Sequence, residues 1–236
     1  MQPKTLRQRY RVPQTWNLNA HFIAPNPETS FNPQSVCPHV HPSAYVGPFS
    51  SVIGDVTLGK NVFVAPLVSV RADEGTPFYI GEDTNLQDGV ILHGLEHEYV
   101  DVGGREYSIH IGSRVSCAHG SLIHGPCRLG NNVFVGFNAI VFGAVVGVGS
   151  YVSAGALVTG GIRVPDGRFV PPYAIVDTQE LADALPLVPQ SQAEFARAVI
   201  RVNTEFPGAY AMMFGPTRCS CGVTCDPGGL HRLRGE

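Results

Sequence analysis

Charged residues are scarce in this chain of 236 residues, since Asp, Glu, Lys and Arg together make up only 15% of it. The formal net charge is −3 and no run of Lys and Arg occurs, so the sequence lacks the electrostatic signature of a nucleic-acid-binding protein. Residues 1–19 contain no apolar stretch of signal-peptide length, and we therefore expect a cytoplasmic protein.

Charge is missing altogether from residues 129–162, a segment longer than a membrane span. Glycine recurs throughout this segment, together with several Asn and Ser residues. Recurring glycines and small polar residues are typical of buried β structure rather than of a lipid-facing helix, so we expect no membrane partner.

What the sequence does contain is a period of six. The hexapeptides VGPFSS, VIGDVT, LGKNVF and VAPLVS follow one another from residue 46, each beginning with an aliphatic residue. The period breaks through residues 94–108, resumes at Ile111 and slips by one residue before Val146. A parallel β-helix has this period, because each hexapeptide forms one strand and one turn, and three of them complete a coil. We predict an all-β fold, a left-handed parallel β-helix of hexapeptide repeats with a C-terminal α-helix packed outside it.

Four parts follow from this pattern. They are an N-terminal arm at 1–45, a β-helix catalytic domain at 46–172, a helical segment at 173–210 and a Cys-rich tail at 211–236. In the helical segment the residues Phe195, Val199, Val202 and Phe206 have helical spacing and predict one apolar face against the β-helix.

Three histidines suggest a metal site. His93 and His124 occupy the second place of their hexapeptides, whereas His119 occupies the third place of another and projects from a neighbouring face. One chain is not expected to bring all three onto a zinc ion, whose bonds to imidazole are only about 2.0–2.1 Å long. A cyclic trimer would create equivalent sites between its subunits. The alternative is that these are solvated turn histidines.

Polar side chains gather in the same stretches. Arg71, Glu74 and Gln87 lie in strand-like units near the proposed metal, whereas Asp83 and Thr84 need be no more than turn formers.

The segments RADEGTPFYIGEDTNLQDGVILHG, SCAHGSLIHGP and VPDGRFVPP, within about residues 40–210, resemble the γ-class carbonic anhydrases and the related N-terminal domain of the carboxysome protein CcmM. The resemblance implies a homotrimer whose metal ligands are His93 and His124 of one subunit and His119 of its neighbour. Zinc, iron and cobalt all suit three imidazoles.

The resemblance also implies roles for other side chains. Gln87 would orient the metal-bound water, Glu74 would take its proton, Glu96 would shuttle the proton to solvent, and Asn203 would be an active-site asparagine.

A further group of three residues matches the ion pairs of the family's subunit interface. These are Arg71, Asp73 and Asp88.

The implied function is carbonic anhydrase, a lyase that hydrates carbon dioxide reversibly to bicarbonate with a metal-bound hydroxide formed from water whose pKa falls to about 7. Carboxysome components are further candidate partners. One alternative is a non-catalytic, zinc-stabilised scaffold or bicarbonate-binding module, although the retention of Glu74 and Glu96 favours catalysis. Another alternative is a hexapeptide acyltransferase with a histidine general base, which does not need three histidines beside an RADEG segment.

The tail allows three interpretations. Cys219, Cys221 and Cys225 could form a second metal site with His231, although their spacing is not a standard one for zinc. Alternatively, Cys225 forms a redox-dependent disulfide with Cys219 or Cys221, or the thiols have no role.

Overall fold

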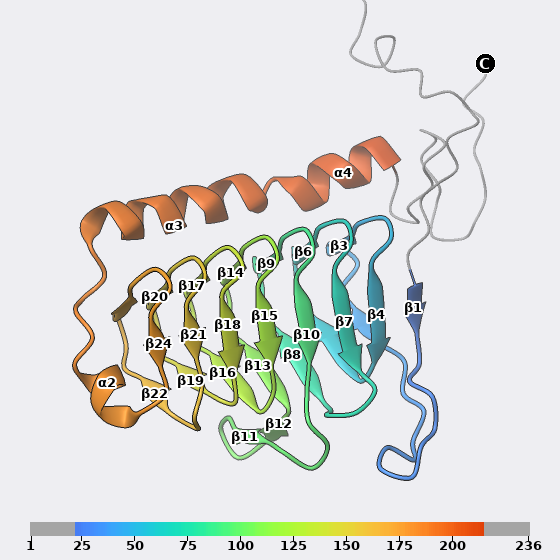
Figure 1. Cartoon of the computed structure of the whole chain (residues 1–236). Helices are drawn as coiled ribbons and strands as arrows, with labels where there is room; N and C mark the ends of the chain where they lie inside the picture. The colour runs from blue at the N-terminus through green and yellow to red at the C-terminus, as the bar shows by residue number, and fades with distance from the viewer. Residues whose placement is uncertain (1–21, 215–236) are drawn as a thin grey trace, which may run out of the picture.

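A computed structural model describes residues 22–214 as a parallel β-helix with helices along one side (Figure 1). Three parallel sheets, here called A, B and C, form the faces of the prism. This confirms the all-β solenoid that the period of six predicts. No helix within the described residues combines the length and hydropathy needed to cross a membrane.

Each sheet takes one short strand from each coil. Sheet A consists of β1 (Phe22–Ala24), β4 (Ser51–Gly54), β7 (Ser69–Ala72), β10 (Ile91–His93), β15 (Leu122–His124), β18 (Ile140–Phe142), β21 (Leu157–Val158) and β24 (Ile175–Val176). Sheet B consists of β2 (His39–Val40), β5 (Val56–Leu58), β8 (Phe78–Ile80), β13 (Ile109–Ile111), β16 (Cys127–Leu129), β19 (Val145–Val146) and β22 (Arg163–Val164). Sheet C consists of β3 (Tyr45–Val46), β6 (Phe63–Val64), β9 (Asn85–Leu86), β14 (Ser116–Cys117), β17 (Phe134–Val135), β20 (Tyr151–Val152) and β23 (Phe169–Val170).

The interior is a set of aliphatic ladders, because side chains alternate between the two faces of a strand. In sheet A one ladder consists of Val52, Val70, Leu92, Ile123, Val141 and Val158, which are paired in register and fully buried. The first and fifth residues of the hexapeptides point inward, as Val52 and Val56 of VIGDVT show, since both are fully buried. Buried ladders therefore account for the uncharged stretch at 129–162.

The structure differs from the expected N-terminal arm at residues 22–45. This part supplies β1, β2 and the first residue of β3, and the amide of Phe22 donates to the carbonyl of Ser50 at 2.8 Å. Proline and histidine interrupt the aliphatic pattern here, but the backbone still pairs with the next coil, since parallel pairing uses main-chain groups alone.

The break in the period at 94–108 is an excursion at the corner between sheets A and B. It carries a small antiparallel hairpin, β11 (Val100–Asp101) with β12 (Glu106–Tyr107). After the excursion β13 pairs with β8 in the ordinary register, so the insertion leaves the stacking of the coils intact (Figure 1).

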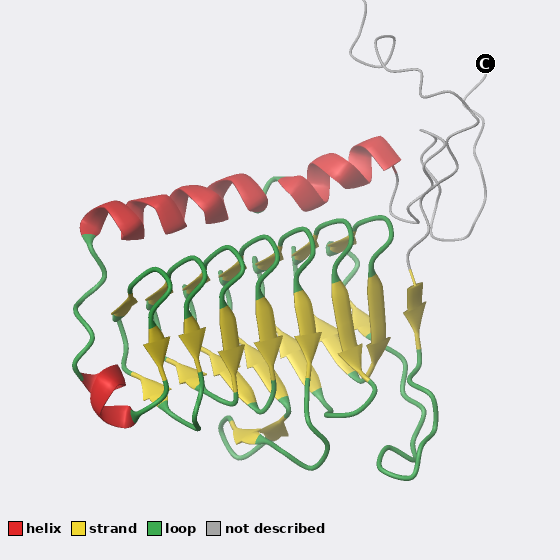
Figure 2. Ribbon diagram, viewed as in Figure 1, coloured by secondary structure: helices red, strands yellow, loops and turns green. Residues whose placement is uncertain are grey.

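Helices α2 (Gln179–Asp183), α3 (Gln190–Asn203) and α4 (Phe206–Phe214) complete the described chain. Figure 2 shows α3 and α4 lying along the prism with a short break between them. Val199 packs with Phe134 and Tyr151 of sheet C, and the ring of Phe206 lies 5.2 Å from that of Phe63. Helices α3 and α4 thus cover the outer face of sheet C.

Leu58 and Thr57 are neighbours on β5 that point to opposite faces, since Leu58 is fully buried and Thr57 is half-buried. We expect Leu58→Ala to lower the free energy of unfolding by about 2–5 kcal/mol, because it leaves a cavity in the ladder. Thr57→Ala should cost less than about 1 kcal/mol. Urea denaturation of both variants checks this, and equal losses would contradict the assigned register.

Candidate metal centre

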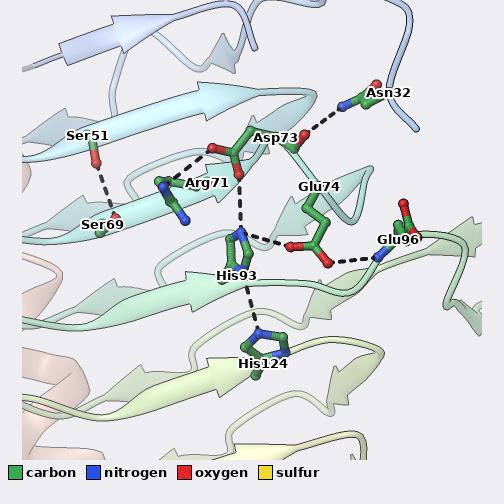
Figure 3. Close-up of polar contacts among 9 residues, drawn as sticks. All are labelled: Asn32, Ser51, Ser69, Arg71, Asp73, Glu74, His93, Glu96 and His124. Atoms are coloured by element: carbon green, nitrogen blue, oxygen red, sulfur yellow. Dashed lines mark hydrogen bonds and ion pairs between the residues drawn. The ribbon is translucent and has the colours of Figure 1, made fainter. Parts of the chain in front are cut away.

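His93 and His124 lie side by side on the outer face of sheet A. They end the adjacent strands β10 and β15 and are directly paired in register, although 31 residues separate them in sequence. Nδ1 of His93 is 3.4 Å from Nε2 of His124, and both side chains are half-buried (Figure 3). Stacking of equivalent hexapeptide positions on consecutive coils brings the two rings together.

Two carboxylates follow β7, the neighbouring strand of the same sheet. Oδ1 of Asp73 is 3.2 Å from Nε2 of His93, and Oε2 of Glu74 is 3.8 Å from the same nitrogen (Figure 3). Asp73 also pairs with Arg71 at 3.6 Å. The exposed residue Glu96 is adjacent, since its backbone amide donates to Oε1 of Glu74 at 3.4 Å.

His119 lies apart from this group, in the turn between β14 of sheet C and β15 of sheet A. Its Nδ1 is 3.0 Å from Oδ2 of Asp88, and its ring stacks on Phe137 with a centroid distance of 5.8 Å. More than half of the His119 side chain is exposed. Within residues 22–214, no three His, Cys, Asp or Glu side chains converge into a metal site.

His119 borders a cleft of about 450 Å³ between the prism and helices α3 and α4. Gln87, Asp88 and Asn203 line the same cleft. Asn203 is 8% exposed, and its Nδ2 donates to the carbonyl of Val199 in its own helix at 3.0 Å. The residues singled out in the sequence therefore fall into two groups, one around His93 and His124 and the other around His119.

Asn85 belongs to the same polar stretch of sequence as Gln87, but the sequence gives it no role, and the structure places it in contact with Gln87. It is fully buried, its Oδ1 accepts a hydrogen bond from Nε2 of Gln87 at 3.0 Å, and its Nδ2 donates to Oγ of Ser116 at 2.9 Å. The sequence does hint at this contact. Asn85 precedes Gln87 by two residues, and residues i and i+2 of a strand lie on the same face.

Each of the three histidines has one ring nitrogen beside an oxygen acceptor. Nδ1 of His124 lies 3.1 Å from the carbonyl of Gly125, and Asp73 and Asp88 provide the acceptors for His93 and His119. An N–H donated to each acceptor leaves Nδ1 of His93 and Nε2 of His124 and His119 with free lone pairs, the arrangement typical of metal-ligating histidines.

The spacing of His93 and His124 also fits a shared cation. Two nitrogens bound to one tetrahedral zinc lie about 3.3–3.4 Å apart, given bonds of about 2.0–2.1 Å. The observed separation of Nδ1 of His93 and Nε2 of His124 is 3.4 Å, which matches that spacing. The donor set therefore suits a divalent metal, with further ligand positions to fill.

The described cysteines take no part in either group. Cys117 and Cys127 are fully buried in the prism, and burial raises the pKa of both thiols, that of Cys127 to about 12. Such thiols are unreactive packing residues. The three tail residues Cys219, Cys221 and Cys225 lie outside the described residues.

No family model matches the chain, but several proteins resemble it. The carboxysome assembly protein CcmM of Nostoc sp. is 46% identical over 172 residues, which are 72% of this chain and 31% of that protein. The carbonic anhydrase of Methanosarcina thermophila is 45% identical over 135 residues, 53% of this chain and 55% of that protein. This chain therefore matches about half or less of the length of these relatives.

Among solved structures, a hexapeptide transferase family protein from Anaplasma phagocytophilum superimposes with a TM-score of 0.60 and 28% identity. The match covers 74% of this chain and 93% of that one. Fold and site together define a parallel β-helix protein that displays a pair of histidines, His93 and His124, in register on the outer face of one sheet. Within that class, the chain belongs to the family of the γ-class carbonic anhydrases and the N-terminal domain of CcmM.

The Asn85 network can be tested without assuming a function. We expect Asn85→Leu to lower the free energy of unfolding by about 1–3 kcal/mol, because it leaves Gln87 and Ser116 without their partner inside the protein. Ser116→Ala removes only one of the two bonds and should cost less. Thermal and urea denaturation of both variants measure the difference, and an Asn85→Leu protein as stable as wild type would rule out the network.

Proposed function

We propose that the protein is a carbonic anhydrase that acts as a homotrimer of left-handed β-helices. A divalent metal, with zinc as the first candidate and iron or cobalt as alternatives, would be held by His93 and His124 of one subunit and His119 of the next. The observation that carries this proposal is the presence, on one chain, of two separate half-sites. One is the pair His93 and His124, whose nearest ring nitrogens are 3.4 Å apart, and the other is the exposed imidazole of His119 beside Asp88.

The surfaces around the half-sites support assembly. On the outer face of sheet A an apolar column runs in register past the two histidines, made up of Ile91, Leu122, Ile140, Leu157 and Ile175. Ile91 is 45% exposed and Ile175 is 61% exposed. Soluble monomers rarely display such a continuous apolar patch. We propose that a second copy of the chain packs against this apolar column.

The second half-site also lies on apolar surface, since Phe137, which stacks under His119, is 44% exposed. In a cyclic trimer each subunit contacts its two neighbours through two different patches. The face of one subunit that carries His93 would therefore contact the corner of the next subunit that carries His119, and this contact would occur three times in the trimer. Arg71 and Asp88, one beside each half-site, are suitably charged to pair across that interface.

The side chains of the chain supply the remaining chemistry. When bound, the metal contributes Lewis acidity, which makes hydroxide available at neutral pH. Gln87 would orient the attacking water, because Asn85 fixes its amide. Glu74, which is close to His93 and one-third exposed, would accept the proton. Glu96 lies next to Glu74 and is exposed, so it would pass the proton to solvent.

A second candidate function is assembly within a carboxysome. Three of the relatives are named carboxysome assembly proteins, from Nostoc, Synechococcus elongatus and Synechocystis. A zinc-stabilised scaffold or bicarbonate-binding module would use the same half-sites without turnover. The acyltransferase alternative has only the shared fold in its support, whereas the histidine half-sites favour carbonic anhydrase.

Mixed trimers test the shared site. We expect His119→Ala and His93→Ala each to lose bound metal and to weaken the trimer, while His39→Ala, an exposed control, retains both. Random mixing of the two inactive variants should restore about a quarter of the metal sites, because an intact site forms wherever His119 of one subunit meets His93 of the other variant. Metal analysis and sedimentation measure this. Mixed trimers that recover no metal would rule out a ligand set shared between subunits.

The proton path gives a separate test. We expect Glu74→Gln to lower turnover by about 100-fold or more with metal content unchanged, because the first proton acceptor is removed. Glu96→Gln should cost less and should regain rate when imidazole buffer is added. Stopped-flow hydration assays across buffer concentrations check both variants. A Glu96 variant that does not respond to added buffer would remove this residue from the path.

A further inference from the structure

A second cleft, of about 400 Å³, lies on the opposite flank of α3. Its floor is the outer face of sheet C, where the rings of Phe134 and Tyr151 are stacked with centroids 4.6 Å apart. Ala193 and Ile200 of α3 contribute to its lining. The cleft is therefore mainly apolar and lies within the lower part of the size range of small-molecule sites.

Two cations border this cleft, one from each of the elements that form it. Arg114 comes from the turn before β14, and Arg197 comes from α3. Nε of Arg114 donates to Oδ1 of Asn132 at 2.9 Å, which fixes the guanidinium in place. No carboxylate lines the cleft, and among the described residues neither arginine has a carboxylate oxygen within 4.0 Å.

The cleft brings two basic side chains to one mainly apolar surface. The chain carries a net charge of −3 and has only 16 Lys and Arg residues, and two of these, Arg114 and Arg197, line this cleft. A guanidinium pair at a low-dielectric surface attracts anions and binds carboxylate or phosphate groups with paired hydrogen bonds.

The cleft is independent of the proposed metal site. His119, Gln87 and Asn203 line the cleft on the other flank of α3, and the two clefts have no lining residue in common. His93 and His124 project from sheet A, whereas Arg114 lies at the corner between sheets B and C. A ligand here would not displace the metal or enter the proposed subunit contact.

We propose that this cleft binds a small organic anion with a compact apolar body, its carboxylate or phosphate group held between Arg114 and Arg197 and its body lying in the apolar part of the cleft between sheet C and α3. The apolar floor supplies affinity for the body, and the arginines select for negative charge. This is a binding site additional to the proposed carbonic anhydrase centre.

Three matched probes test the proposal on the full chain. They are 2-naphthoate, 2-naphthyl phosphate and the neutral 2-naphthamide, and binding is measured by calorimetry and saturation-transfer NMR. We expect at least one anion to bind at least about tenfold more tightly than the amide, since charge recognition is worth about that factor or more. The tighter of the two anions identifies the preferred head group.

Variants locate the binding. Arg114→Gln and Arg197→Gln should each weaken binding of the better anion about tenfold or more, and Ala193→Leu should block it by filling the cleft. Arg163→Gln, an exposed arginine on sheet B, is the matched control and should bind as wild type does. Metal content is measured in parallel, so failure of the metal proposal is seen separately.

Three results would overturn the proposal. They are equal affinity for the anions and the amide, unchanged binding in both cleft arginine variants, and no binding of either anion up to about 1 mM, the concentration that would half-fill a site with a Kd of about 1 mM.

Discussion

The stacking of each coil on the next is the constraint on which the rest of the structure depends. Main-chain hydrogen bonds join consecutive coils, such as that from the amide of Gly81 to the carbonyl of Ile111 at 2.9 Å. These bonds could form in more than one register, and burial of the aliphatic ladder selects the observed one. Leu92 and Ile123 then meet inside the prism, and His93 and His124 necessarily meet outside it. One alignment gives the protein both its core and its paired imidazoles.

The sequence predicted the solenoid because burial of the first and fifth residues of the hexapeptides leaves a period of six in the sequence. The same reasoning put His93 and His124 at equivalent places, which the strand register bears out. It failed to predict the strands at 22–24 and 39–40, since backbone pairing there does not require an aliphatic pattern. The break between α3 and α4 was also missed, because the apolar spacing continues through Phe206.

Side-chain orientation was the least predictable property of the candidate site. Asp73 and Asp88 resemble interface ion-pair residues in sequence, yet each also lies beside an imidazole of its own chain. The hexapeptide period does not predict which histidine nitrogen lies beside Asp73 or Asp88, since this depends on the geometry of the turns. Asn85 went unassigned for a related reason, because a buried amide on a strand has the sequence pattern of an ordinary polar residue until its neighbours are known. Whether His119 completes a metal site with a neighbouring chain stays a prediction.

The excursion at 94–108 shows how such a protein can change in sequence without losing its pair of histidines. The chain leaves the prism after His93, forms the hairpin β11–β12, and returns to pair with β8 as though no residues had been added. The separation of His93 and His124 is therefore set by adjacent rungs and not by the length of chain between them. The excursion at this corner can become longer or shorter, or can carry a new module, with little effect on the position of the two histidines. New sequence can therefore be inserted a few residues from His93, by evolution or by protein engineering. The stacked coils keep the spacing of His93 and His124 constant.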